Sequence, residues 1–309
     1  MKVLITGAGG PGSEALAKKW NHHEIMFVDS SIKRIHPSIP IHSCVEIPMG
    51  SDSDFYQQIG LIIRKFGIEV VVSQVDEELE ALNLLQNELR TFELITPGLN
   101  FVKLCNNKAA LGENLLSRGI LEPNTEPLSP RTQKRLSNMV FKPSFGRGSR
   151  GIFFFRNDCS FEDLKNYLLS TNVPYVIQDE IVGEEYTVQV MANRQGILKA
   201  IVPVRVFEKR GSTTSCKVSL NKNVITTVVN LHEAFRPVGT YNVQLIVNSE
   251  TNNSSIIEIN PRVSTTLCLS LELGLDPIDL FFDDTDYLHV PKSELFLNRY
   301  WTNFFSTSE

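Results

Sequence analysis

The first part of the chain alternates short apolar runs with stretches in which apolar residues recur at helical spacing. The apolar runs predict buried strands at 2–6, 24–29, 68–73 and 92–96. The periodic stretches predict a helix that begins at Ser13 and helices within 51–67 and 75–89. Strands that alternate with helices are typical of a parallel sheet with crossover helices. We therefore predict an α/β, Rossmann-like N-terminal domain over residues 1–97.

After residue 97 the pattern changes to strand-like runs that are mostly separated by short turns. Helices are predicted within 107–119, 161–170 and 271–277. Strands are predicted within 138–157, 175–207, 224–229, 240–247 and 255–260. We expect the amphipathic tail, 291–309, to pack on the body of the protein. Because short turns join antiparallel strands, we predict an α+β domain over residues 98–309.

Composition narrows the class of protein. The chain has 309 residues, of which 42% are hydrophobic and 21% charged, which is enough for more than one core. Its formal net charge of -5 disfavours a protein that binds nucleic acid through phosphate contacts. The 5 cysteines form no C-x-x-C pair, which argues against a zinc site or disulfide framework and fits a reducing compartment. No run approaches the roughly 18 apolar residues of a membrane span, and no signal-peptide pattern is seen. We expect a cytoplasmic protein that binds neither membrane nor nucleic acid.

The turn after the first predicted strand, "GAGGPG" (7–12), is the first candidate motif. Its glycines, together with Asp29 at the end of the next strand, match the dinucleotide-binding fingerprint. The glycines let the backbone bend, and a helix N-terminus attracts an anion. The rest of the chain lacks the pattern of an oxidoreductase. We therefore favour a tight turn, or a contact to another ligand, over a nicotinamide site.

A second motif, "FKPSFGRGSRG", combines a lysine at the end of a strand with a loop of small residues. The residues concerned are Lys142, Ser144, Gly146, Gly148 and Gly151, and Arg147 and Arg150 lie among them. Small residues let backbone N–H groups approach phosphate oxygens, and a lysine contacts phosphate as a point charge. The motif predicts a phosphate site, and the alternative is a solvated hairpin tip.

A third motif, "VIQDEIVGEEY", lies where another predicted strand ends. Gln178, Asp179 and Ile181 are on this strand or its exit, and Glu185 follows a glycine. An exit segment of this kind offers backbone N–H and C=O groups to a flat base, and a carboxylate a few residues on can accept hydrogen bonds from ribose hydroxyls. We interpret it as a nucleoside site, with a charged β-turn as the alternative.

The fourth motif consists of two strands, "TYNVQLIVN" and "IIEINPR". Gln244 lies on the polar face of the first strand, and Glu258, Asn260 and Arg262 occupy alternate positions along the second, with Ile257 and Ile259 on its other face. If the strands form a hairpin, Gln244 faces Glu258 and Asn260. Oxygen ligands of this kind suit Mg²⁺, and a guanidinium beyond them can hold a transferring phosphoryl group. The alternative is a surface strand with polar alternation.

In this order, the last three motifs resemble those of the ATP-grasp superfamily, in its carbamoyl-phosphate-synthase-like branch and in a short form with one module. The resemblance extends from residue 1 to about 280. It implies a Rossmann-like pre-ATP-grasp domain (1–97) followed by an ATP-grasp domain (98–309) of two antiparallel subdomains, with a lid at roughly 118–178. In this family ATP lies between the two antiparallel sheets. The N-terminal glycine turn borders the acceptor substrate and binds no nicotinamide.

The resemblance also implies roles for individual residues. Those implied to bind ATP are Lys108, Lys142, Ser144, Gly146, Gly148, Gly151, Gln178, Asp179, Ile181 and Glu185. Those implied to hold Mg²⁺ (or Mn²⁺) are Gln244, Glu258 and Asn260. Lys142 and Arg262 are the implied catalytic residues, and the arginine would steady the γ-phosphate and the acyl phosphate formed from it.

The expected activity is an ATP- and Mg-dependent ligation, in which a carboxylate is activated as an acyl phosphate and joined to an amine with release of ADP and phosphate. Small-molecule carboxylates and amines are the expected partners, and a homodimer is the default assembly. Candidates for the acceptor site are Arg205, Arg210 and Lys217 for a carboxylate, and Asp76, Glu77 and Glu78 for an amine. The alternative for the three acidic residues is a helix N-terminus that carries acidic side chains. A single module disfavours synthesis of carbamoyl phosphate itself. Two alternatives stay open: a non-catalytic ATP-binding regulatory module and, less favoured, an NAD(P)-dependent oxidoreductase.

Overall fold

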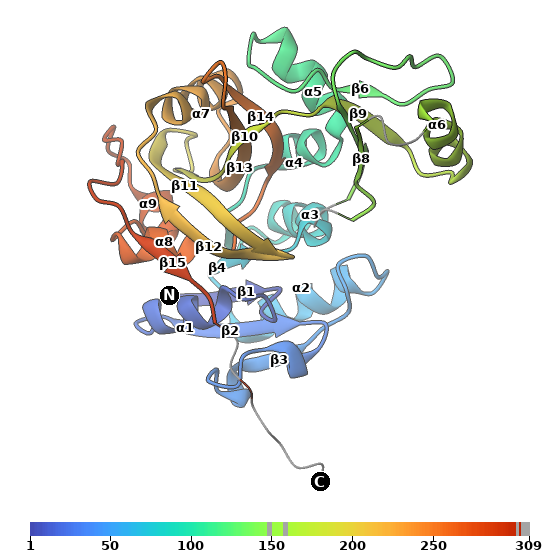
Figure 1. The fold of residues 1–309 in the computed structure, drawn as a ribbon. Coiled ribbons are helices and arrows are strands. Elements are labelled where there is room, and N and C mark those ends of the chain that lie inside the picture. The colour runs from blue at the N-terminus through green and yellow to red at the C-terminus, as the bar shows by residue number, and fades with distance from the viewer. Residues whose placement is uncertain (147–149, 157–159, 301–302, 304–309) are drawn as a thin grey trace.

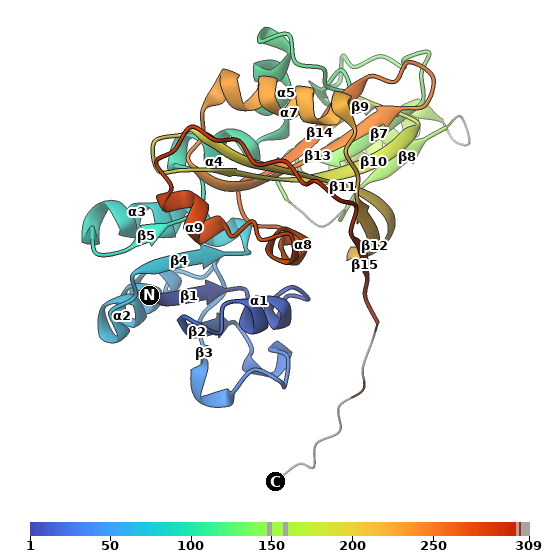
Figure 2. The ribbon, with the colours of Figure 1, turned by 90° about the vertical axis from the view of Figure 1, so that its left-hand side faces the viewer.

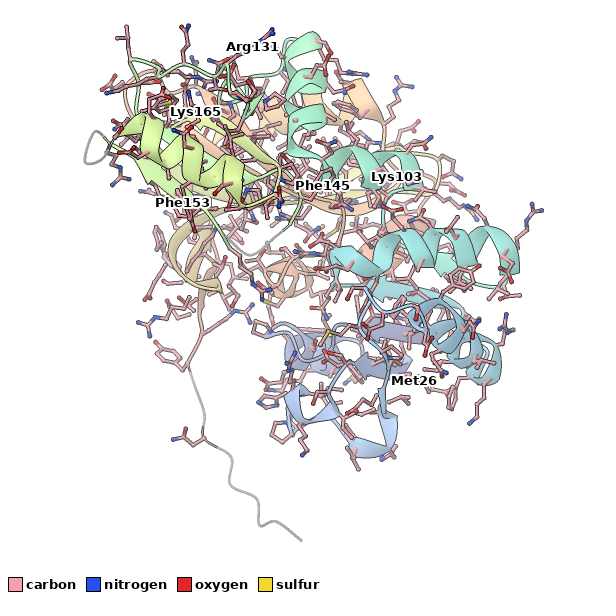
Figure 3. The ribbon with its side chains drawn as sticks, turned by 90° about the vertical axis from the view of Figure 1, so that its right-hand side faces the viewer. Met26, Lys103, Arg131, Phe145, Phe153 and Lys165 are labelled. Atoms are coloured by element: carbon pink, nitrogen blue, oxygen red, sulfur yellow. The ribbon has the colours of Figure 1, made fainter. Side chains whose placement is uncertain are left out.

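The computed structural model describes residues 1–146, 150–156, 160–300 and 303. Within these residues the strands form three sheets, which we call A, B and C. Figure 1 shows sheet A at one end of the molecule, sheet C next to it, and sheet B with α6 (Phe161–Ser170) beyond sheet C. We call sheet B together with α6 the lid. Figure 3 places Phe153 and Lys165 on the lid and Met26 at the opposite end, on sheet A.

Sheet A is parallel throughout, with the strand order β3-β2-β1-β4-β5. Its strands are β1 (Lys2–Thr6), β2 (Glu24–Asp29), β3 (Cys44–Glu46), β4 (Val70–Ser73) and β5 (Glu93–Leu94). The accompanying helices are α1 (Ser13–Lys19), α2 (Phe55–Phe66) and α3 (Leu79–Leu89), with short 3₁₀ turns η1 (Ile32–Arg34), η2 (Ile41–Ser43) and η3 (Asp76–Glu78). The predicted strands are confirmed. The sequence did not predict β3, because a strand this short shows no alternation.

Sheets B and C are antiparallel, as predicted, with the orders β6-β9-β7-β8 and β14-β13-β10-β11-β12-β15. The strands of sheet B are β6 (Glu126–Pro127), β7 (Met139–Pro143), β8 (Phe153–Phe155) and β9 (Tyr175–Asp179). Those of sheet C are β10 (Gly183–Ala192), β11 (Leu198–Arg210), β12 (Ser212–Val218), β13 (Gly239–Asn248), β14 (Ser254–Asn260) and β15 (Phe296–Asn298). The remaining helices are α4 (Leu99–Asn106), α5 (Lys108–Ser117), α7 (Lys222–Phe235), α8 (Leu267–Glu272) and α9 (Pro277–Phe282).

One predicted strand is wrong, because residues 224–229 lie inside α7. Their run of valine, isoleucine and threonine has the composition of a strand. The buried positions Val224, Val228 and Leu231 instead follow the spacing of a helix. The side chain of Asn221 caps that helix by accepting hydrogen bonds from the backbone N–H groups of Asn223 and Val224. Capping and burial of one face therefore outweigh local strand propensity here.

Sheet C is covered by helices on both faces. One face packs through Val202 and Val204 into a core cluster that also contains Val3 and Ile5 of sheet A, and α8 and α9 belong to the same cluster. Figure 2 shows these two helices between the sheets. The other face packs on α5 and α7. Because one apolar core joins sheets A and C, the two are fixed relative to each other.

The connection between sheets A and C is tight at Gly239, the first residue of β13. Its φ angle is +71°, and a Cβ atom there would lie 2.9 Å from both the carbonyl carbon and the oxygen of Ile95. The next backbone N–H, that of Thr240, donates to the same Ile95 oxygen at 2.8 Å. Only glycine fits both the backbone conformation and the close approach.

The described helices are all too short or too polar to cross a membrane.

We expect Gly239→Ala to lower the free energy of unfolding by about 2–4 kcal/mol, since it adds left-handed strain and a clash with backbone. Gly67→Ala is the matched control, because Gly67 has a φ of +62° but a Cβ added there would have no atom within 4 Å. That variant should lose only about 1 kcal/mol. Urea denaturation followed by circular dichroism measures both, and equal losses would contradict the packing argument.

Candidate active site

A cavity of about 260 Å³ lies between the lid and sheet C. Of the residues predicted to bind nucleotide or metal, those that line it are Lys108, Lys142, Gly146, Gln178, Asp179, Ile181, Glu185, Gln244 and Glu258. Ser144, Gly151, Asn260 and Arg262 do not line it, and Gly148 lies outside the described residues, as does Arg147. Chain segments far apart in sequence therefore meet at this cavity.

Lys108 connects the lid to sheet C. It is the first residue of α5, whose N-cap Asn107 accepts a hydrogen bond from Ala110 N–H. Its ammonium donates to the carbonyl oxygen of Gly146 at 2.8 Å and lies 3.4 Å from Oε1 of Glu258. Its backbone N–H donates to the carbonyl oxygen of Ser144 at 3.0 Å, so Ser144 supports the lysine from outside the cavity. A buried ammonium next to a carboxylate is suited to hold a polyanion there.

Lys142, on β7, has a perturbed acidity. Burial lowers the pKa of its ammonium from 10.5 to about 8. The positive charge of Lys108 adds to the lowering, and the carboxylate of Glu258 opposes it. Desolvation destabilises the charged form of the ammonium, so a phosphate group that binds there would stabilise that charged form.

The loop after β7 has the conformational freedom that a close approach to a ligand requires. Gly146 has a φ of +117°, a Cβ added there would meet no atom of the described residues within 4 Å, and the glycine lines the cavity. Gly151 has a φ of +69° and packs at the base of the loop, where a Cβ would lie 3.2 Å from Pro143 Cγ. Arg150 lines the cavity between these glycines.

The segment that leaves β9 forms the other end of the cavity. Gln178 donates through Nε2 to Thr125 Oγ1 at 2.9 Å. The carboxylate of Asp179 accepts hydrogen bonds from Arg135 and Ser137, which lie in the segment between β6 and β7. Apolar side chains also line the cavity, and an apolar slot between them would suit a flat base. They are Val140, Ile152, Phe154, Ile181, Ile246 and Ile257.

Glu185, on β10, forms an ion pair with Lys209 on β11, and both line the cavity. The sequence did not single out Lys209. Register shifts next to Val206 and Glu208 interrupt the alternation of faces along β11. Counting alternate residues from the start of the strand therefore assigns Lys209 to the wrong face. The candidate acceptor residues Arg205, Arg210 and Lys217 do not line the cavity, and they pair with the carboxylates of Glu184, Glu208 and Glu294.

The predicted hairpin of β13 and β14 forms in the expected register. Gln244 lies opposite Glu258, and Asn242 lies opposite Asn260. The prediction that Ile257 lies on the buried face is wrong. Gln244 pairs with Glu258 and Leu245 with Ile256, so a bulge forms at Ile257, and Ile257 lines the cavity next to Glu258. The side chains of Gln244 and Glu258 therefore point to the same space from neighbouring strands.

The oxygen donors of this hairpin fit a hard cation such as Mg²⁺. Gln244, Glu258 and Asn260 supply one carboxylate and two amide oxygens. Within the described residues there is no group of three or more His, Cys, Asp or Glu side chains that could hold a metal. A set with a single carboxylate suits a cation that keeps water and phosphate oxygens among its ligands.

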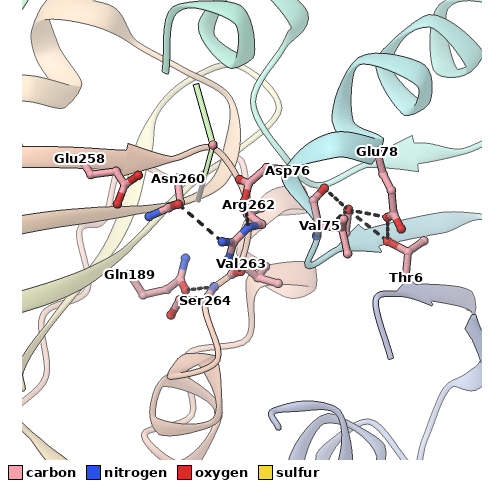
Figure 4. A network of polar contacts seen from close by, with 12 residues as sticks. Thr6, Val75, Asp76, Glu78, Gln189, Glu258, Asn260, Arg262, Val263 and Ser264 are labelled. Carbon is pink, nitrogen blue, oxygen red and sulfur yellow. Dashed lines mark hydrogen bonds and ion pairs between the residues drawn. The ribbon is translucent and has the colours of Figure 1, made fainter. Parts of the chain in front are cut away.

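Arg262 follows the end of β14, where its side chain contacts the N-terminal half. Its Nε donates to Oδ2 of Asp76 at 2.8 Å, and one terminal guanidinium nitrogen, Nη1, donates to the carbonyl oxygen of Val263 at 3.1 Å. The other, Nη2, lies 3.5 Å from Oδ1 of Asn260, as Figure 4 shows. The guanidinium thus lies between the predicted metal ligands and sheet A.

The glycine turn does not present a ribose-binding carboxylate. Both carboxylate oxygens of Asp29 accept backbone hydrogen bonds, one from Gly9 N–H at 2.8 Å and one from Ser31 N–H at 3.1 Å. The turn also packs on the segment after β14, since a Cβ at Gly12 would lie 3.4 Å from the carbonyl oxygen of Thr265. These contacts favour the tight-turn interpretation over a nicotinamide site.

Comparison by sequence gives a family match over the region that forms this site. The family model for the ATP-grasp domain matches residues 105–266. The chain is also similar to the carbamoyl phosphate synthase large chains of Streptomyces coelicolor and Streptomyces avermitilis, with 23% and 22% identity over 154 residues. Each match covers 45% of this chain but 14% of the relative, so the chain corresponds to a small part of those proteins.

Comparison by structure gives neighbours over most of the chain. The L-amino acid ligase from Bacillus licheniformis has a TM-score of 0.67 at 14% identity, with 91% of this chain and 72% of that chain covered. The N5-carboxyaminoimidazole synthetase from Staphylococcus aureus has a TM-score of 0.67 at 15% identity, with 91% and 76% covered, and a similar structure of it holds ADP. The D-alanine–D-alanine ligase from Bacillus anthracis has a TM-score of 0.60 at 15% identity, with 91% and 95% covered. These neighbours share the fold and confirm the predicted fold class.

We expect the affinity for a nucleoside triphosphate to weaken as pH rises through about 8, the pKa of Lys142. Below that pH the ammonium is charged and attracts phosphate, and above it a proton must be taken up on binding. The dissociation constant should therefore rise up to about ten-fold per pH unit. Lys142→Arg should flatten this dependence, because a guanidinium stays charged. Isothermal titration at several pH values measures both, and a flat wild-type profile would contradict the assignment.

Proposed function

The chain belongs to the ATP-grasp domain family, and from this premise we propose that it is an ATP-dependent ligase that joins a small carboxylic acid to an amine. The observation that carries the proposal is the meeting of Lys108, Glu258 and Gln244 at one end of the cavity. An ammonium there suits phosphate oxygens, and facing oxygen donors suit a divalent cation. Binding of a nucleotide alone does not require both. Two neighbours named as ligases, and a neighbour named as a synthetase whose structure holds ADP, support the proposal.

ATP lies along the cavity in this proposal. The apolar slot next to Gln178 and Ile181 takes the adenine, and Glu185 takes the ribose hydroxyls. The phosphates then extend toward Lys108 and Lys142, whose positive charges offset theirs. Lys209, which pairs with Glu185, adds a further cation to the same wall.

Gln244, Glu258 and Asn260 would hold Mg²⁺ in this arrangement. When bound, the cation neutralises charge on the phosphate oxygens. Glu258 is the single carboxylate among the three, so it supplies the negative charge of the protein ligand set. Its ion-pair partner Lys108 keeps that charge balanced in the absence of other ligands.

The reaction follows from these positions. A carboxylate oxygen attacks the γ-phosphorus, the bond to the bridging oxygen breaks, and ADP leaves with that electron pair. Lys142 and Arg262 stabilise the charge on the transferring group. The amine then attacks the acyl carbon, phosphate leaves, and the amine loses a proton. The lid limits access of water to the acyl phosphate. No covalent intermediate with the protein is needed.

The substrates proposed are an amino acid or a sugar acid, together with an amine. Two structural neighbours carry amino-acid ligation in their names. The test is a screen for ADP release with Mg²⁺, ATP and pairs drawn from these classes. ADP release that depends on both acid and amine would support the proposal. Tight ATP binding with no turnover for any pair would favour a regulatory module, and binding of NADH in place of ATP would favour an oxidoreductase.

Glu258→Gln tests the metal assignment with little change in shape. We expect ADP release to fall at least about 100-fold, because the carboxylate charge at the cation is lost. Glu184→Gln is the control, since Glu184 is on β10 next to Glu185 but pairs with Arg205 outside the cavity. That variant should keep near wild-type turnover. Normal turnover in Glu258→Gln would show that Glu258 is not a metal ligand.

A further inference from the structure

The ion pair of Asp76 and Arg262 joins two parts of the chain that the sequence separates widely. Asp76 is in the turn after β4 of sheet A, and Arg262 follows β14 of sheet C. Oδ2 of Asp76 accepts a hydrogen bond from Nε of Arg262 at 2.8 Å. Both side chains are largely buried, with 12% and 16% of their surface exposed. Water therefore screens this pair much less than a surface pair.

The turn that carries Asp76 is held firmly. The carboxylate of Glu78 is buried and accepts hydrogen bonds from the hydroxyl groups of Thr6 and Ser73. The loops that contain Gly7 and Gly50 pack closely against this turn, because a glycine has no Cβ atom. A Cβ at Gly7 would lie 2.4 Å from Val75 Cγ2, and one at Gly50 would lie 2.7 Å from Glu78 Cγ. Figure 4 shows the line of polar contacts from Thr6 and Glu78 toward Asp76. Asp76 is thus presented on a rigid base.

The segment that carries Arg262 is also fixed, but its side chain has few other restraints among the described residues. Gln189 Oε1 accepts a hydrogen bond from Ser264 N–H at 3.1 Å, which sets the path of the backbone after Arg262. Among the described residues, the guanidinium contacts, apart from Asp76, one neutral carbonyl, that of Val263, and it approaches Asn260 to 3.5 Å. Glu258 lies four residues earlier in the sequence, on β14. Without Asp76, the guanidinium would turn toward this carboxylate and compete for a predicted metal ligand.

We propose that Asp76 is a positioning residue, which holds the guanidinium of Arg262 in place for the transferring phosphoryl group and away from Glu258. The proposal rests on the proposed function, because it takes the phosphoryl role of Arg262 from there. Through Asp76, the N-terminal sheet contributes to the phosphoryl site without touching the nucleotide. In this proposal the turn acts through Arg262. That role differs from the amine binding that the sequence suggests for Asp76, Glu77 and Glu78.

The test compares binding of Mg·ADP with binding of Mg·ADP plus aluminium fluoride, which mimics a phosphoryl group in transfer. Titration calorimetry on the full chain gives both dissociation constants without knowledge of the acid substrate. The variants are Asp76→Asn, Asp76→Glu, Arg262→Ala and the double variant Asp76→Asn/Arg262→Ala. Glu80→Gln, which removes one exposed negative charge in the first turn of α3, is the control. Melting temperatures show that each variant is folded.

We expect aluminium fluoride to increase the affinity of the wild type for Mg·ADP. In Asp76→Asn this increase should be about ten-fold smaller, while the affinity for Mg·ADP alone changes little. The double variant should lose no more than Arg262→Ala, because Asp76 acts through the arginine. Asp76→Glu keeps the charge but moves it, so it should lose part of the gain, and it replaces Asp76→Asn if that variant does not fold. Glu80→Gln should behave as wild type.

The other outcomes separate this inference from the proposed function. If wild type does not bind Mg·ADP, the proposed function fails, and the inference fails with it. If wild type binds Mg·ADP but Asp76→Asn keeps the full fluoride gain, only the inference is overturned. Two further results would overturn the proposal that Asp76 positions Arg262. One is that aluminium fluoride does not increase the affinity of the wild type, and the other is that Asp76→Asn also loses affinity for Mg·ADP alone.

Discussion

The candidate site depends on the register in which β13 pairs with β14. With Gln244 opposite Glu258 and Asn242 opposite Asn260, the polar groups of both strands share one face. A shift by one residue would turn these groups into the apolar core under α7. The bulge at Ile257 refines this arrangement, because Ile256 and Ile259 stay buried while two consecutive residues, Ile257 and Glu258, reach the cavity. The wall of the cavity is thus at once apolar and anionic.

Much of this arrangement is encoded locally, so the sequence predicts it. The strands of sheet A are short apolar runs between clear turn signals, and the polar alternation of Glu258 and Asn260 stands out from their isoleucine neighbours. Lys142 and Glu185 are recognisable because each lies next to a glycine-containing turn. The resemblance of these motifs as a set then indicates the family, which none of them indicates alone.

The features that the sequence did not predict depend on tertiary contacts. The valines of α7 form a helix because one side of it packs on sheet C and Asn221 caps its start, and the cap alone does not reveal the helix against their strand propensity. Lys209 reaches the cavity only because bulges interrupt β11. Asp76 meets Arg262 because α8 and α9 fix the distance between sheets A and C. The acidic turn was noticed in the sequence, but its partner lies 186 residues away.

Sheet A, α8, α9 and sheet C share one apolar core, and this limits how the N-terminal sheet can be exchanged during evolution. Helices encoded near the end of the chain complete the burial of a sheet encoded at its start. Recombination that exchanged the N-terminal sheet for that of a relative would leave these helices against a foreign surface. Sheet A and the helices α8 and α9 are therefore expected to be inherited together. Variation in the ligands bound is expected to arise by point substitution in loops more readily than by exchange of domains.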